Sequence, residues 1–324
     1  MKNVKKKDVA LALLLLTVCS CDKEVTTGTE EHTPQPFTAN AVVTGFSATG
    51  DNEPAVNMLW NETDAFDLYL PEYPGNKYEF KIDWNSAGDD KTKANFTCTR
   101  FTRPEEGTAF YSFYPAGKFQ YAGGKYHFIL PEFTQSVNGS TDHLKEGFAM
   151  QATGNFSDNV SLSFAHKTAL LKMEITNKRP EETTIQSLEL TSGTSSCFGY
   201  TYSTDGTSSE YPAQAKKVSL GFNEGIKLDA SGGNEPVLEA YTLTMPGAGI
   251  TDETVFAFIA RLADGTTVRS QDIPGSEIAK DENSKTWKAG CCYTFQLELE
   301  DHALRLTSFR INDFETGKND NITL

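Results

Sequence analysis

The residue with the clearest chemistry is Cys21, which ends the run Val18-Cys19-Ser20-Cys21. A basic stretch, residues 2–7, and an apolar stretch, residues 9–18, precede it, and the apolar stretch is too short to span a bilayer. This order is typical of a bacterial lipoprotein signal peptide, in which a small residue stands before the cysteine that receives the lipid. Ser20 meets that requirement, so we predict cleavage between Ser20 and Cys21 and a thioether-linked lipid on Cys21. The alternative is an ordinary secretory signal with incidental cysteines.

The other cysteines carry no recognisable reactive pattern. An even number of them permits disulfides in an oxidising compartment, but no spacing matches a zinc site or a C-x-x-C redox motif. We favour buried free thiols, and leave the disulfide state open, for Cys98, Cys197, Cys291 and Cys292.

Catalytic motifs are missing from the sequence. It contains no H-E-x-x-H, no G-x-S-x-G, no phosphate-binding loop and no G-x-G-x-x-G. The five histidines are scattered, and only His166 falls inside an apolar strand pattern, where a hydrogen-bonded core histidine is the simpler interpretation. We therefore predict that the protein is not an enzyme, with no catalytic residue, no cofactor-binding residue and no metal site.

Aromatic residues offer a second chemistry, stacking on sugar rings. Most of them lie in alternating apolar runs, which favours core packing over an exposed binding shelf. The candidates are Trp60, Trp84, Trp287, Tyr111, Tyr114, Tyr121 and Tyr126.

The net charge of −15 limits the partners of the chain. An acidic surface disfavours nucleic acid and disfavours charge-driven binding to anionic lipid. Hydrophobic residues make up 38% of the 324 residues, enough to build a packed core.

The elements that must position these residues are strands. The stretch Leu162–Thr176, LSFAHKTALLKMEIT, holds two alternating runs whose phase slips at Lys167-Thr168. Such a slip predicts a bulge, or a corner where the chain passes from one sheet to another. We predict that a first β domain ends just before this stretch and a second begins with it.

The whole chain follows the same pattern of short alternating runs separated by turn residues, with no helical stripe of ten residues or more. We expect an all-β protein. The predicted segments are a signal peptide at 1–20, a flexible polar tether at 21–36, an N-terminal β domain at 37–157 and a C-terminal β domain at 158–324.

Several stretches, in this order, resemble the fimbrillin superfamily, the surface pilins and pilin-like lipoproteins of Bacteroides-type bacteria. They are the lipobox at Cys21, N-M-L-W-N-E-T-D-A-F at 57–66, F-Y-S-F-Y-P at 110–115, F-A-H at 164–166, W-K-A-G-C-C-Y-T-F-Q-L at 287–297 and I-N-D-F at 311–314. They span nearly the whole chain.

The resemblance implies two tandem transthyretin-like β-sandwich domains, no enzymatic activity, and assembly by β-strand exchange. In such assembly the first strand is cut away and a neighbour's C-terminal strand fills the groove. The candidate donor strand is 303–324, with pocket-filling side chains at Leu304, Leu306, Phe309 and Ile311; the alternative is that this strand completes the C-terminal sheet.

One departure bears on the role. Shaft pilins of the family are cut after an arginine that follows the first strand, and this chain has no arginine before Arg100. We therefore expect a surface-exposed fimbrial lipoprotein of the outer membrane, an anchor, tip or accessory subunit rather than a shaft subunit, whose partners are other fimbrial subunits and a surface glycan or protein. The alternative is a glycan-binding surface lipoprotein that does not polymerise.

Overall fold

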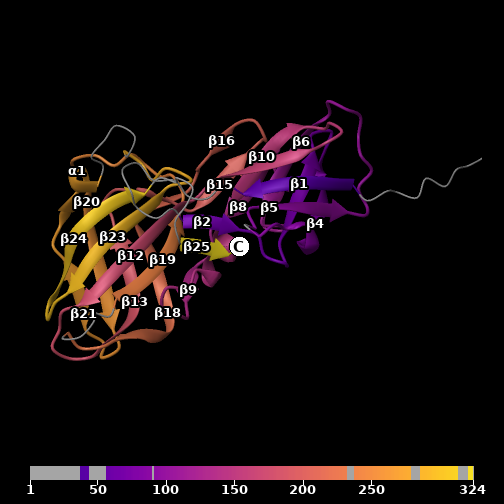
Figure 1. Ribbon diagram of the computed structural model, residues 1–324. Coiled ribbons are helices and arrows are strands. Elements are labelled where there is room, and N and C mark those ends of the chain that lie inside the picture. Colours follow the sequence, from indigo (N-terminus) through magenta and orange to yellow (C-terminus); the bar gives the residue numbers. More distant parts are fainter. Residues whose placement is uncertain are drawn as a thin grey trace, which may run out of the picture. The chain divides into compact units, whose positions relative to one another are not determined.

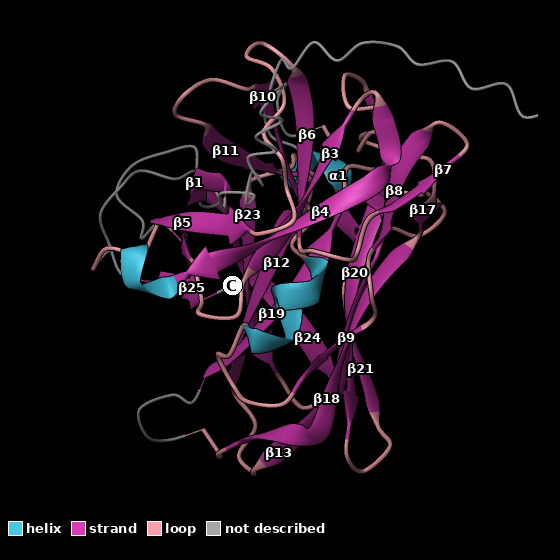
Figure 2. Cartoon of the chain, turned by 90° about the vertical axis from the view of Figure 1, so that its right-hand side faces the viewer, coloured by secondary structure: helices cyan, strands magenta, loops and turns pink. Residues whose placement is uncertain are grey.

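The computed structural model describes residues 37–43, 56–89, 91–231, 237–278, 285–312 and 320–323. Strands dominate these residues, and the helical segments are short: η1 (Trp84–Ser86), η2 (Asp142–Gly147) and α1 (Gly275–Ile278) (Figure 2). No helix in this part of the chain is both long and apolar enough to cross a membrane. The all-β fold predicted from period-two alternation is confirmed.

The first sheet closes into a barrel. Successive side chains of a strand point to opposite faces, and large aromatic rings fill the interior, among them Phe66, Phe80 and Phe96, all fully buried. The rings of Phe66 and Phe80 stack at 5.2 Å. In the order of pairing, the strands are β1 (Phe37–Val43), β11 (Ser161–His166), β10 (Met150–Asn155), β6 (Ala109–Tyr114), β3 (Ala65–Leu70), β4 (Tyr73–Asp83) and β5 (Lys93–Cys98).

The second sheet is larger and is built from the later part of the chain, except for one short strand (Figure 1). One tight turn follows directly from the sequence: Asp264-Gly265 is a dipeptide typical of hairpins, and Gly265, at a φ of 86°, lies in the turn between two hairpin strands. In order, the strands are β19 (Val237–Thr244), β12 (Ala169–Asn177), β23 (Cys292–Leu299), β24 (Ala303–Asn312), β21 (Thr267–Ser270), β20 (Val255–Leu262), β13 (Thr183–Thr191), β18 (Lys217–Leu228) and β9 (Phe133–Gln135), with β22 (Ile273–Pro274) paired to β20.

The mid-chain phase slip is a corner between the two sheets. β11 pairs with β1 and β10 in the barrel, and β12 pairs with β19 and β23 in the larger sheet. The chain passes from one sheet to the other at Lys167-Thr168, later than the predicted domain boundary at 157/158, which stays a prediction. Leu162 and Phe164 belong with the first core because β11 is hydrogen-bonded into the barrel.

Three small ladders link distant parts of the chain. β8 (Lys125–Ile129) pairs with β15 (Thr201–Thr204) in the order β16-β15-β8-β7, with β16 (Ser209–Glu210) and β7 (Gln120–Ala122). β14 (Phe198–Gly199) pairs with β17 (Gln214–Ala215). β2 (Val56–Leu59) pairs in parallel with β25 (Asp320–Thr323), and the two lie side by side in Figure 1.

Candidate strand-exchange site

The first strand, β1, closes the barrel. It runs antiparallel to β5, with Phe37 opposite Cys98 and Val42 opposite Lys93, and parallel to β11, with Asn40 opposite Ser161. A strand bonded on both edges satisfies the backbone N–H and C=O groups of two neighbours. Its removal would leave two facing strand edges unpaired, which is the geometry that an added strand can fill.

Among the described side chains of β1, residues 37–42, those that point inward are one aromatic ring and two methyl groups. The ring of Phe37 lies 5.4 Å from that of Phe101 and 5.6 Å from that of Phe156. Ala39 and Ala41 are fully buried. A strand that takes the place of β1 therefore needs small side chains at these two positions, because larger ones would overpack the barrel interior. The start of the N-terminal β domain was predicted at residue 37, but the sequence of β1 gives no sign that the strand closes a barrel.

Trp60 holds β1 against the aromatic core of the barrel. Its indole N–H donates a hydrogen bond of 3.2 Å to the carbonyl oxygen of Ala41, and its side chain is fully buried. The ring packs edge-on against Phe96 at 4.9 Å and Phe164 at 6.0 Å. The tryptophan of the N-M-L-W stretch thus joins β1 to the aromatic core.

The turn after Trp60 is held by a buried carboxyl group. Asp64 accepts hydrogen bonds from the backbone N–H of Asn61 at 2.6 Å and from the hydroxyl of Tyr114 at 3.0 Å. Burial raises the pKa of Asp64 from 3.8 to about 6, more strongly than these hydrogen bonds lower it. Asp64 is thus a titrating group in the floor of the barrel.

The raised pKa of Asp64 predicts a pH-dependent stability. A carboxyl group whose pKa is higher in the folded state stabilises that state below pH 3.8 and loses this contribution as the pH rises through about 6. The rise corresponds to about 3 kcal/mol at most. We expect Asp64→Asn to abolish this decrease in stability with rising pH. The amide can accept a hydrogen bond from the N–H of Asn61 and donate one to the oxygen of Tyr114 without ionising. Urea unfolding between pH 4 and pH 8 measures the difference, and Asp89→Asn, at an exposed aspartate, is the control. Parallel pH profiles of Asp64→Asn and the unchanged protein would contradict the prediction.

The predicted donor residues lie in their own sheet. β24 pairs antiparallel with β23 along its length and parallel with β21 at its start. Leu304 is buried, and Leu306, Phe309 and Ile311 pack partly buried against the core. Leu304 and Leu306 alternate in one phase, and Phe309 and Ile311 alternate in the other. A β-bulge separates them, because Gln296 faces Ser308 whereas the next residue, Leu297, faces Leu306. The second of the two interpretations, a strand that completes the C-terminal sheet, describes β24 in this chain.

The last strand of the predicted donor segment behaves differently. β25 pairs with neither large sheet; its residues Asp320–Thr323 face Val56–Leu59 of β2 in a short parallel ladder. The C-terminal end of the described chain therefore returns to the segment that follows β1 in the sequence. Ser20 and Cys21, the predicted cleavage and lipidation residues, lie outside the described residues.

The aromatic candidates for sugar stacking are divided by the fold. Trp60 and Trp287 are fully buried, and Tyr114 and Tyr126 are also in the core. Trp84 is half-buried, with the Nζ atom of Lys91 5.2 Å from its ring centre. Of the seven candidates, only Tyr121 has an exposed side chain. These residues therefore do not form the coplanar exposed shelf that the glycan-binding alternative requires.

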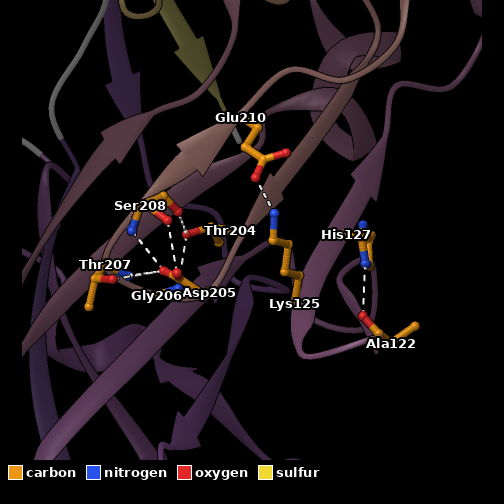
Figure 3. A network of polar contacts seen from close by, with 9 residues as sticks. All are labelled: Ala122, Lys125, His127, Thr204, Asp205, Gly206, Thr207, Ser208 and Glu210. Atoms are coloured by element: carbon orange, nitrogen blue, oxygen red, sulfur yellow. Dashed lines mark hydrogen bonds and ion pairs between the residues drawn. The ribbon is translucent and has the colours of Figure 1, made fainter.

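The small sheet around β15 carries a polar network that stabilises its hairpins (Figure 3). Asp205 accepts hydrogen bonds from the backbone N–H groups of Thr207 at 2.8 Å and Ser208 at 2.7 Å, and these bonds lower its pKa. Lys125 of β8 forms an ion pair with Glu210 of β16. Asp205 is engaged within its own turn, and Glu210 joins the β15–β16 hairpin to β8, so the network explains how the small sheet is held together rather than a ligand site.

The described cysteines and His166 are buried. The cysteines at 98, 197, 291 and 292 are thiols rather than disulfides, as favoured from their spacing. His166 is buried at the end of β11, with its ring 6.2 Å from that of Phe148. Among the described residues, no group of three or more His, Cys, Asp or Glu side chains is arranged to hold a metal ion.

The fold defines the class of the protein first: an all-β protein with a barrel closed by its first strand and a larger second sheet. A family model described as fimbrillin-like matches residues 46–313, and the chain belongs to this family. It is accordingly a structural protein of the fimbrial, cell-surface kind and not an enzyme. The match confirms the resemblance to the fimbrillin family that was found in the sequence.

Two solved structures show the same fold at low sequence identity. A candidate cell adhesion protein from Bacteroides ovatus is 13% identical, with a TM-score of 0.55 over 88% of this chain and 99% of that chain. A candidate cell adhesion protein from Bacteroides uniformis is 17% identical, with a TM-score of 0.51 over 86% of this chain and 98% of that chain. No curated protein matches the sequence.

Proposed function

We propose that this protein is a fimbrial subunit at the outer surface, held to the outer membrane by a lipid on Cys21 and joined to other subunits by β-strand exchange. The observation that carries the proposal is the position of β1, bonded on both edges and packed on an aromatic floor. Whichever chain supplies a strand at that position completes the barrel.

The role that fits best is that of an anchor, tip or accessory subunit. No arginine stands before Arg100, and Lys77 is the first lysine after Lys23, so an arginine-specific protease has no site between β1 and β2. A subunit that keeps its own first strand cannot receive a donor strand there. Such a subunit would stand at the end of a series of subunits joined by strand exchange, not within the series.

The segment best suited to change partners is the C-terminal end beyond β24. Withdrawing β24 would expose β23 and β21 and remove Leu304 from the core, at a large cost in free energy. Among the described residues, the backbone of β25 pairs with β2 alone, in a short ladder outside both large sheets. A deletion that tests strand donation should therefore begin at residue 313, because one that begins at 303 also removes a strand of the second sheet.

The proposal can be tested by cutting the chain after it has folded. We expect a protein that starts at residue 22 and carries an engineered protease site within 44–55 to be monomeric before the cut. After the cut, β1 is held by packing and hydrogen bonds alone, and slow exchange with the C-terminal ends of other copies should produce oligomers. Size-exclusion chromatography with light scattering measures the mass, and mass spectrometry detects the released β1 fragment.

Two controls make the result specific. The same cut in a protein that lacks residues 313–324 should release β1 without forming oligomers. A cut in a site placed within 232–236 should leave the protein monomeric. If the cut protein retains β1 indefinitely, or loses it without forming oligomers at any concentration, strand exchange at this site is wrong.

A further inference from the structure

β19 is an end strand of the larger sheet with a long outer edge. One edge pairs with β12 over the whole strand, from Ala169 opposite Thr244 to Thr176 opposite Val237. In an antiparallel strand, the backbone groups of alternate residues point to opposite edges, so those of Val237, Glu239 and Tyr241 point outward. If it were left uncovered, an edge of this length would be a template for pairing with another chain.

Two side-chain carboxamides occupy this outer edge in place of a strand. Asn138 donates from Nδ2 to the carbonyl oxygen of Val237 at 2.9 Å and accepts at Oδ1 from the N–H of Glu239 at 2.8 Å. Gln135 donates from Nε2 to the carbonyl oxygen of Glu239 at 2.7 Å and accepts at Oε1 from the N–H of Tyr241 at 3.0 Å. Each amide bonds the C=O of one residue and the N–H of the residue two further on, as the N–H and C=O groups of a single residue in a parallel strand do.

The neighbouring groups complete this cover. The ring of His143 contacts the carbonyl oxygen of Tyr241 through Nε2 at 2.7 Å, and the backbone N–H of Gly139 donates to Glu239 at 3.1 Å. Gly139 has a φ of 75°, and a Cβ there would lie 3.2 Å from the carboxylate of Glu239, so only glycine fits without strain. We call Gln135, Asn138, Gly139 and His143 the edge clasp.

The edge clasp also joins the two ends of the sheet. Gln135 is the last residue of β9, and its backbone lies opposite Phe222 of β18, while its side chain bonds β19. β9 and β19 are the terminal strands in the order of this sheet. Gln135 is fully buried, and Leu144, which follows the clasp, is fully buried too, so packing holds the clasp against the edge.

We infer that the edge clasp takes the place of a neighbouring strand on β19 and keeps that edge from pairing with β19 of a second copy of this chain. The strand has the sequence VLEAYTLT, with one charge and several β-branched or aromatic residues, which is the composition that pairs readily once exposed. Two copies can pair this edge with itself across a two-fold axis, because antiparallel pairing of identical strands is self-complementary. Any strand exchange elsewhere in the molecule would then proceed without competition from this edge.

The test removes the clasp amides from the otherwise complete protein, starting at residue 22. We expect Gln135→Ala/Asn138→Ala to form a concentration-dependent dimer, measured by light scattering, whereas the unchanged protein remains a monomer. At low concentration, hydrogen exchange at the amides of Glu239 and Tyr241 should be about tenfold faster in the variant, because these N–H groups lose their acceptors. At high concentration, pairing between copies should restore their protection.

Two further variants keep the result interpretable. Gln120→Ala/Asn76→Ala changes the same residue types at exposed positions outside the clasp and should leave the protein monomeric. Asn138→Asp affects an exposed residue, keeps the side-chain shape and turns a donor toward Val237 into an acceptor, so it should produce the dimer more weakly even if the double variant does not fold. If Asn138→Asp, shown to be folded by circular dichroism, stays monomeric with unchanged exchange in β19, the inference is overturned.

Discussion

Replacing Trp60 with alanine is expected to lower the free energy of unfolding by about 3–5 kcal/mol, the range for removing a large buried aromatic side chain. Trp60 is fully buried and its ring contacts Phe96, Tyr114 and Phe164. The variant also loses the hydrogen bond to Ala41, so β1 should be affected more than the rest of the barrel. Denaturant unfolding measures the free energy, and hydrogen exchange at the amides of residues 38–42 measures the local effect.

Trp287 provides the matched control for Trp60. It is also fully buried, but it packs in the second sheet, against Tyr293 at 4.9 Å and Phe198 at 5.5 Å. Trp287→Ala should cost a similar free energy without preferentially speeding exchange in β1. Trp60→Phe keeps most of the volume and removes the indole N–H, so it should cost about 1 kcal/mol from the hydrogen bond. Equal exchange rates in β1 for Trp60→Ala and Trp287→Ala would contradict the role assigned to Trp60.

Replacing Cys21 with alanine is expected to move the protein from the membrane fraction to the soluble fraction almost completely. Each buried CH₂ group of an acyl chain contributes about 0.8 kcal/mol to membrane binding, so a lipidated and an unlipidated protein differ by far more than surface contacts can supply. The net charge of −15 adds no attraction to anionic lipid. Fractionation followed by mass spectrometry of the mature N-terminus measures both the location and the acyl chains.

Cys19 is the control for this prediction, because it stands two residues away and follows Val18, a poor residue before a lipidated cysteine. Cys19→Ala should leave the protein anchored and cleaved between Ser20 and Cys21. If Cys21→Ala remains in the membrane fraction while Cys19→Ala leaves it, the lipid is on Cys19. If both variants remain anchored, the lipoprotein interpretation is wrong.

The local pattern of the chain predicted most of its strands. The alternation at 162–166 and 169–175 predicted β11 and β12, the break at Asn61–Asp64 falls between β2 and β3, and Asp264-Gly265 forms its hairpin. These succeed because period-two burial and turn chemistry are properties of a few consecutive residues. A local pattern of this kind fails at Trp84: it continues the alternation of aromatic and aliphatic residues in 78–82, yet β4 ends at Asp83 and a short 3₁₀ helix begins.

The candidate site was only partly predictable. The segment 303–324 was identified as one candidate donor strand, but it contains two strands with different partners, β24 in the second sheet and β25 beside β2. Neither pairing can be read from spacing, because each joins residues far apart in the chain. The edge clasp was missed for the same reason: Gln135 and Asn138 look like ordinary loop residues until Val237–Tyr241 is placed beside them.

By itself, the sequence determined that this protein is all β, that it resembles the fimbrillin family and that Cys21 is its candidate lipid attachment site. These conclusions depend on short-range patterns, alternation, turn residues and a signal-peptide motif, which are complete within a few consecutive residues. The tertiary structure alone decided that β1 closes the barrel, that β24 is built into the second sheet and that the edge of β19 is covered by side-chain amides. Those are contacts between residues far apart in the chain, such as Asn40 with Ser161 and Gln135 with Tyr241, and only the folded chain brings such residues within hydrogen-bonding distance.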